Sequence, residues 1–172
     1  MSALATPVEA RPAATIALVR DHQGQVEVFL VRRHARSGFM ANAYVFPGGR
    51  LDPADESPEL LACLGSRVEE LTGRMEAVAS ESKAQAHLVA AVRETFEEAG
   101  ILLVTDSNGG PVSPERGWQD ALNKGERSFE SIVVGEGLRM DTRQVVKRRC
   151  CARVPARLLP DTFSTALLPF SY

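Results

Sequence analysis

The stretch that decides the fold is RETFEEAGI, residues 93–101. It places Glu94, Glu97 and Glu98 beside Arg93, just before a glycine. Helical residues three and four apart lie on the same side, so the three carboxylates project from one face, and Arg93 can hydrogen-bond Glu97 and fix its rotamer. Two interpretations stay open at this point: an ordinary solvated helix face, or a site for a hard divalent cation, Mg²⁺ or Mn²⁺, which prefers oxygen ligands.

The neighbouring residues predict an amphipathic helix over residues 86–99. The side chains that share the face opposite the carboxylates, at helical spacing, are Leu88, Val92, Thr95, Phe96 and Ala99. Gly100 is expected to end the helix, because glycine readily takes the left-handed conformation found just beyond a helix end. Residues 101–104 (ILLV) then predict a buried strand, and residues 106–111 predict a turn.

Upstream, the sequence predicts a β-hairpin that leads to a pair of glycines. Residues 14–20 and 25–33 are rich in strand-forming side chains and flank the turn-like DHQG. After a loop over 34–43, residues 44–49 (YVFPGG) predict a strand that ends at Pro47, which has no N–H for a ladder. The glycines either let the backbone approach another group, with a carbonyl as a further metal ligand, or form a plain turn.

A helix-prone segment separates the glycines from the carboxylate helix. A serine followed by a proline opens residues 57–64, which is a favourable helix start, and residues 66–85 are polar and helix-prone. Farther along, residues 114–140 predict two short helices. Residues 143–172 mix a basic cluster with three prolines and show no sustained hydrophobic period, so they predict no element.

Composition restricts the class of protein. A chain of 172 residues with 44% hydrophobic residues is expected to fold as one domain with a proper core. A net charge of -2 and 6% aromatic residues argue against nucleic-acid and anionic-membrane binding. The three cysteines are odd in number and two are adjacent, which suits a reducing compartment. We therefore expect a cytoplasmic protein without a signal peptide or membrane span.

FPGG followed by RETFEEAGI resembles the signature of the Nudix hydrolase family, G-x5-E-x7-R-E-U-x-E-E-x-G-U, in which U is bulky and apolar. Gly49 takes the first position, Asp55 stands where Glu is usual, and Thr95 stands where a bulky apolar residue is usual. The arginine would then fall near position 63 but is Arg93, so the motif is split by the helical segment over residues 53–86.

A split motif of this kind is similar to that of the peroxisomal coenzyme A diphosphatases of animals and their bacterial relatives. The resemblance covers residues 13–105 and rests on RSGFMANAYVFPGGRLDPAD before the insertion and AVRETFEEAGILL after it. It implies the α/β class, with a Nudix-type α/β/α sandwich, a mixed sheet and a helical insertion inside the motif. From the chain length, residues 1–172 are expected to form a single domain.

The resemblance also implies roles for individual residues. Glu94 and Glu98 would be the main Mg²⁺ or Mn²⁺ ligands, with Glu97 contributing or acting as base. Gly48 would offer its carbonyl to the metal, and Arg93 would orient the glutamates. Three further arginines flank the expected cleft and are either phosphate-binding or solvated strand-end residues: Arg32, Arg33 and Arg50. The oligomeric state stays open.

Three functions follow from the resemblance. The first is metal-dependent hydrolysis of the pyrophosphate of coenzyme A or an acyl derivative, and the second is broader hydrolysis of ADP-ribose, dinucleotides or nucleotide sugars. The third is a Nudix-like protein that no longer catalyses. The family's usual continuation is not recognisable in residues 141–172, so we expect either a fold that is incomplete at its C-terminus or an unrelated tail.

Overall fold

The structure is a computed structural model, and it describes residues 11–35, 41–73, 75, 80–144 and 164–171. The strands are β1 (Pro12–His22), β2 (Gln25–Phe29), β3 (Val31–Arg32), β4 (Tyr44–Val45), β5 (Gly48–Arg50), β6 (Val104–Thr105), β7 (Arg139–Met140) and β8 (Ser164–Ser171). The helices are η1 (Pro53–Glu56), α1 (Pro58–Ala62), α2 (Val68–Thr72), α3 (Glu81–Ala99), α4 (Trp118–Asn123), α5 (Phe129–Val133) and η2 (Thr142–Gln144). This mixture confirms the α/β class.

Strand β1 organises the main sheet. Its second half pairs antiparallel with β2, and its residues 13–15 pair antiparallel with β5. Strand β8 pairs antiparallel with residues 12–19 of β1 and therefore occupies the opposite edge. Among the described residues the strand ladders are all antiparallel, and the parallel pairing is an isolated bridge between Leu64 and Met140. The tail, which shows no readable period, thus contributes a strand to this sheet.

The predicted hairpin over residues 14–33 is confirmed in its first part. Gln23 and Gly24 both have positive φ, 52° and 78°, which suits the tight turn that joins two antiparallel strands. The second strand, however, is shorter than predicted, because β2 ends at Phe29. The chain resumes as β3, which pairs with β4 in a separate two-stranded ladder.

The strand predicted within residues 44–49 ends before Pro47, as expected, but the glycines after it form a second strand that was not predicted. Pro47 separates β4 from β5, and the two strands belong to different sheets. The carbonyl of Pro47 accepts a hydrogen bond of 2.9 Å from the amide of Ile16, which draws the following residues onto β1. Gly48 has φ 154°, and a Cβ atom there would collide with the carbonyl oxygen of Ala14. Glycine is therefore required where β5 meets β1.

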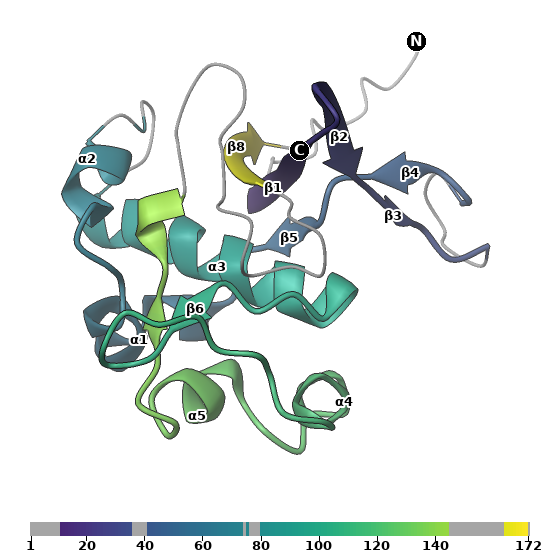
Figure 1. Ribbon diagram of the computed structural model, residues 1–172. Helices are drawn as coiled ribbons and strands as arrows, with labels where there is room; N and C mark the ends of the chain where they lie inside the picture. Colours follow the sequence, from purple (N-terminus) through teal and green to yellow (C-terminus); the bar gives the residue numbers. More distant parts are fainter. Residues whose placement is uncertain (1–10, 36–40, 74, 76–79, 145–163, 172) are drawn as a thin grey trace, which may run out of the picture.

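Helix α3 crosses the molecule between the sheet and the layer that contains α1, α4 and α5 (Figure 1). It begins at Glu81, earlier than the predicted residue 86, because the Ser80 side chain accepts a hydrogen bond from the amide of Lys83 and caps the helix. It ends at Gly100, which has φ 69°, as predicted. Most side chains in the middle of α3 are buried, because other elements pack against the helix on more than one side.

The helical insertion is part of the hydrophobic core. Leu60, Leu64, Val68 and Leu71 are buried and belong to the same cluster as the apolar residues of α3. The prediction of a helix-prone segment over residues 66–85 is only partly met, because α2 spans five residues and residues 81–85 already belong to α3. None of the described helices has the length and apolar character needed to span a bilayer.

The connection between the insertion and β7 is made by backbone groups. The amide of Met140 donates to the carbonyl of Cys63 at 2.8 Å. The guanidinium of Arg139 donates to the carbonyls of Ala62 and Leu64, both at 3.3 Å. Gly65 packs closely against Thr142, and a larger residue would not fit there, because a Cβ atom at Gly65 would lie 2.6 Å from the Thr142 hydroxyl oxygen. We refer to residues 62–67 with residues 139–143 as the backbone junction.

The segment after α3 differs from the prediction of a strand over residues 101–104. Only Val104 and Thr105 pair, with β7. Leu102 and Leu103 are buried without a ladder, so their apolar character reflects core packing rather than strand formation. The two short helices predicted within residues 114–140 are confirmed as α4 and α5. The adjacent cysteines 150 and 151 lie outside the described residues.

Candidate functional site

The site is built around a buried ion pair between Arg93 and Asp55. Nε of Arg93 donates to Oδ1 of Asp55 at 2.8 Å, and Nη2 donates to Oδ2 at 2.9 Å. The side chain of Asp55 is 1% exposed and that of Arg93 is 12% exposed. Two parallel bonds of this kind fix the plane of the guanidinium, and a bidentate pair is among the strongest side-chain contacts.

Asp55 is held in place by its own helix. In η1 the Asp52 side chain accepts from the amide of Ala54, while Asp55 Oδ2 accepts from the amide of Asp52 at 2.8 Å. This reciprocal capping box satisfies backbone donors at the start of the helix. The same carboxylate therefore ties off η1 and binds Arg93. Asp55 is the position that aligns with the first glutamate of the Nudix signature, and the structure gives it a buried partner 38 residues away.

Arg93 also contacts two of the three glutamates, as the sequence predicts for one of them. Its Nη1 donates to Glu94 Oε1 at 2.9 Å and to Glu97 Oε2 at 3.1 Å. Its Nη2 donates to the carbonyl of Arg50 at 3.0 Å, which joins α3 to the end of β5. Burial acts to lower the pKa of Arg93, but the hydrogen bonds and charge of Asp55, with both glutamates, outweigh it and raise that pKa.

Glu94 lies directly against Gly49. A Cβ atom at Gly49 would collide with the Glu94 carboxylate, so only glycine leaves room for it. Burial raises the pKa of Glu94, and the charges of Glu97 and Glu98 raise it further, while Arg93 opposes both effects. The glycine pair is therefore a close approach between β5 and the carboxylates of α3, and not a plain turn.

Glu98 contacts the other glycine of the pair. The amide of Gly48 donates to Glu98 Oε2 at 3.1 Å. Burial raises the pKa of Glu98 and the charge of Glu97 adds to it, whereas the Gly48 hydrogen bond and the charge of Arg33 act to lower it. Burial is the largest cause of both raised pKa values and the neighbouring carboxylate charges add to it, so a cation placed there would favour the ionised forms.

The divalent cation predicted from the sequence is tested by this arrangement. Within the described ranges, no group of three or more His, Cys, Asp or Glu side chains is gathered as a metal site. Glu94 and Glu98 nevertheless face adjacent glycines, and Glu97 is bound to Arg93. The carboxylate oxygens of Glu94 and Glu98 therefore fit a hard cation such as Mg²⁺ or Mn²⁺, whereas the group of Gly48 that faces Glu98 is its N–H and not its carbonyl.

The three predicted phosphate-binding arginines are in different situations. Arg33 lies near enough to Glu98 for its charge to act on that carboxylate. The side chain of Arg32 donates from Nη2 to Oδ1 of Asn42 at 3.1 Å, within the β3–β4 connection. Arg50 ends β5 and is exposed, and its carbonyl is the group that binds Arg93. The structure thus brings Arg33 and the backbone of Arg50 to the carboxylates, but not the Arg32 guanidinium.

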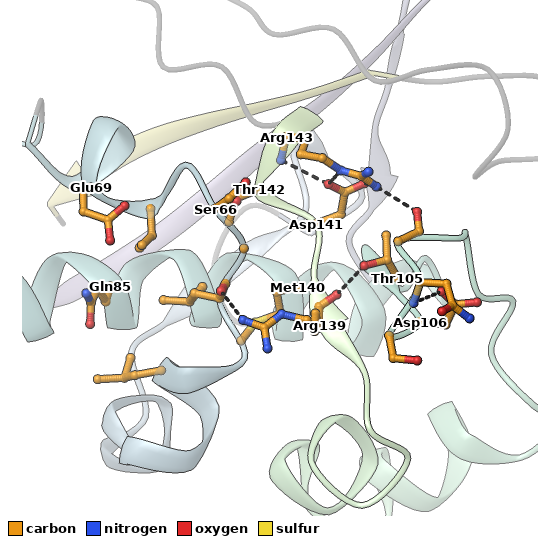
Figure 2. A pocket seen from close by; sticks show the side chains of 17 residues that line it. Ser66, Glu69, Gln85, Thr105, Asp106, Arg139, Met140, Asp141, Thr142 and Arg143 are labelled. Atoms are coloured by element: carbon orange, nitrogen blue, oxygen red, sulfur yellow. Dashed lines mark hydrogen bonds and ion pairs between the residues drawn. The ribbon is translucent and has the colours of Figure 1, made fainter.

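Two of the hollows near α3 border contacts described above. One, of about 280 Å³, borders the ion pair and is lined by Asp52, Ala54, Asp55, Leu60, Arg93, Glu97, Ser128, Phe129 and Glu130. The other, of about 630 Å³, borders the backbone junction, and Figure 2 shows Gln85 and Asp106 on opposite sides of Arg139, with Asp141 and Arg143 above them in this view. Its arginines are engaged, because Arg143 binds Asp141 and the carbonyl of Gly109.

Three residues that support the site escape sequence reasoning. Asp55 appears in the sequence only as a departure from a signature, and nothing local marks it as buried. Gln119 and Asn123 of α4 donate their side-chain amides to the main-chain carbonyl of Glu97, at 3.0 and 3.2 Å. The only feature of the sequence that links these two residues is that they are four positions apart, a spacing that occurs in every helix.

Comparison with known proteins identifies the domain and its fold. The model of the NUDIX domain matches residues 10–136. A NUDIX hydrolase from Alicyclobacillus acidocaldarius has a similar structure, with a TM-score of 0.61 and 29% identity over 80% of this chain and 59% of that one. This neighbour confirms the Nudix-type fold predicted from the resemblance.

Two curated relatives are also similar. The acyl-coenzyme A diphosphatase NUDT19 of Xenopus laevis is 33% identical over 107 residues, which is 52% of this chain and 28% of the relative. That of Gallus gallus is 38% identical over 96 residues, 45% of this chain and 25% of the relative. The matched part is thus about a quarter of the length of these relatives. On its domain match and its fold, the chain belongs to the Nudix family.

Proposed function

We propose that the chain is a metal-dependent Nudix pyrophosphohydrolase that cleaves the pyrophosphate of coenzyme A or an acyl-coenzyme A. The observation that carries the proposal is the placement of Glu94 and Glu98 against the paired glycines, with Arg93 fixed beside them. The substrate class rests on the similarity to acyl-coenzyme A diphosphatases. A cytoplasmic location, with a small nucleotide-like substrate and no nucleic acid, is proposed from the composition and the cysteine pattern.

Mg²⁺ or Mn²⁺, when bound, would neutralise the pyrophosphate, polarise the P–O bond and lower the pKa of water. Glu94 and Glu98 would hold the cation, with the Gly48 carbonyl as a further oxygen donor. Arg93 is the orienting group, because its position is fixed by Asp55 and it reaches both Glu94 and Glu97.

Glu97 is the proposed base. It would take the proton from the attacking water, whose oxygen forms a bond to phosphorus as the bridging P–O bond breaks. With coenzyme A the products are 3′,5′-ADP and a 4′-phosphopantetheine fragment. Arg33, which already acts on Glu98, is the best placed of the three arginines to meet a phosphate, and Arg50 follows it at the end of β5.

The test compares the wild-type protein with Glu98→Gln and with Glu115→Gln, a matched change at an exposed residue. Each is offered coenzyme A, ADP-ribose, NADH and diadenosine polyphosphates with Mg²⁺ or Mn²⁺. We expect turnover of coenzyme A by the wild type and Glu115→Gln, and loss of turnover in Glu98→Gln. Equal background from all three proteins would overturn the enzymatic proposal, and turnover of several substrates would favour the broader hydrolase.

A further inference from the structure

The C-terminal turn of α3 is clamped by two side-chain amides from α4. The last four carbonyls of a helix lack partners within it. The carbonyl of Phe96 accepts from the amide of Gly100 at 2.9 Å. The carbonyl of Glu97 instead receives Nε2 of Gln119 at 3.0 Å and Nδ2 of Asn123 at 3.2 Å. Two donors thus converge on one oxygen inside the carboxylate segment.

The donors come from an anchored element. Gln119 and Asn123 are four residues apart and lie on the same side of α4. The helix is fixed by Trp118, which is buried, and the guanidinium of Arg127 lies 5.6 Å from the centre of its ring. The Gln119 carboxamide is also fitted against the helix end, since a Cβ atom at Gly100 would lie 2.9 Å from its Oε1.

The two side-chain amides bind the backbone of Glu97, next to the two side-chain contacts that α3 makes at the site. The carbonyl of Glu97 belongs to the same residue as the carboxylate bound to Arg93, and the next residue is Glu98, which reaches Gly48. A rotation of this last turn would move both side chains together. The amide donors also reduce the negative potential at the helix C-terminus, which otherwise adds to the repulsion among the carboxylates.

We propose that Gln119 and Asn123 are positioning residues that hold the last turn of α3 and thereby, through the placement of Glu98, set the affinity of the carboxylate site for a divalent cation. The proposal rests on the proposed function, because it requires that cation to bind. Outer groups that orient metal ligands typically change affinity by about 10- to 100-fold when they are removed.

The test measures Mn²⁺ binding to the full chain by titration calorimetry, without substrate. Gln119→Met and Asn123→Leu remove the donors without adding charge. Gln85→Met is the matched control, because Gln85 lies on α3 nine residues before Glu94, far from the clamp. We expect the dissociation constant to rise about tenfold in the double variant, less in each single variant, and to stay unchanged in the control.

A second series separates positioning from general destabilisation. Gln119→Asn shortens the side chain but keeps its polarity, and it covers the case in which Gln119→Met does not fold. All titrations are made below the thermal unfolding midpoint of each variant, as followed by circular dichroism. For turnover, we expect a higher Mg²⁺ concentration for half-maximal rate with an unchanged KM for the nucleotide.

The outcomes distinguish this proposal from the one on which it rests. Unchanged Mn²⁺ affinity in the folded double variant, with normal binding by the wild type, overturns the clamp alone. Absence of Mn²⁺ binding by the wild type overturns the metal-dependent function and the clamp with it. A tenfold loss in the double variant with an intact control supports both.

Discussion

Besides its apolar packing on α3, the helical insertion contacts the rest of the chain at the carboxylate site and at the backbone junction, and these two contacts use different chemistry. At the carboxylate site, one buried carboxylate, Asp55, meets one guanidinium, Arg93. At the backbone junction, main-chain groups carry much of the contact, including the amide of Met140 on the carbonyl of Cys63. A single substitution can remove the first contact. The second contact cannot be removed by deleting one side chain, and it can be weakened only by adding volume next to it or by replacing Arg139.

The largest effect is expected when the ion pair is broken. Arg93→Ala leaves the Asp55 carboxylate buried without its partner, and loss of one member of a buried pair costs about 3 to 5 kcal/mol. Urea unfolding followed by circular dichroism measures it. Glu136→Ala, which removes the more exposed pair with Arg127, should cost no more than about 1 kcal/mol. Similar losses in both variants would contradict the comparison.

The backbone junction should be sensitive to added volume. Gly65→Ala would place a Cβ atom 2.6 Å from the Thr142 hydroxyl oxygen and 2.9 Å from the Met140 carbonyl oxygen. Overpacking of this kind typically costs about 1 to 3 kcal/mol. The adjacent exposed Ser66→Ala is the control, with an expected change within about 0.5 kcal/mol. If Gly65→Ala is as stable as Ser66→Ala in thermal unfolding, the junction has room for a Cβ atom at position 65.

A smaller loss is expected from the side chain at the same junction. Arg139→Ala removes a guanidinium that donates to the carbonyls of Ala62 and Leu64. Because both bonds are long and water can replace the donor, we expect about 1 kcal/mol of destabilisation. Arg116→Ala, at an exposed arginine of the α4 approach, serves as the comparison in the same denaturant series and should be near neutral.

The smallest effect should have the opposite sign. Burial first, and then the Glu97 charge, raise the pKa of Glu98 in the folded protein. The folded state therefore binds this proton more tightly than the unfolded chain, and stability falls as pH rises through that window. Without metal, Glu98→Gln should be more stable at neutral pH by about a few tenths of a kcal/mol, as expected for removal of a like charge on a helix.

Two measurements check this last prediction. Thermal unfolding in a chelating buffer should show the advantage of Glu98→Gln at pH 7 and its disappearance at low pH, where the wild-type carboxyl is protonated. Added Mg²⁺ should then reverse the order by stabilising only the wild type. A variant that is less stable than the wild type at pH 7 in the chelating buffer would show that the Glu98 charge is already satisfied.

Local signals predicted the elements that depend on neighbouring residues. The turn at Gly24, the stop at Gly100 and the separation of α4 from α5 all follow from short-range chemistry. The sequence failed where packing decides. Leu102 and Leu103 are buried without strand pairing. The start of α3 was placed too late, because Ser80 caps the helix at Glu81, within the stretch predicted to be helix-prone. An apolar run does not by itself specify the element.

The sequence predicted the carboxylates of the site but not the residues that hold them in place. The spacing of Glu94, Glu97 and Glu98 follows from helix geometry, and the contact of Arg93 with Glu97 is confirmed. The role of Asp55 requires knowledge that two segments 38 residues apart meet, and the role of Gln119 requires the docking of α4. Metal binding and the phosphate contacts of Arg32, Arg33 and Arg50 stay predictions.

The burial of Leu60, Leu64 and Leu71 has a consequence for protein engineering. A segment that interrupts a signature motif invites removal, so that the two halves are joined by a short linker. Here those three side chains fill space beside α3, and their deletion would leave an apolar hollow that a linker cannot refill. A shortened design would therefore have to redesign the facing side of α3, including Leu88 and Val92, before the two halves could be fused.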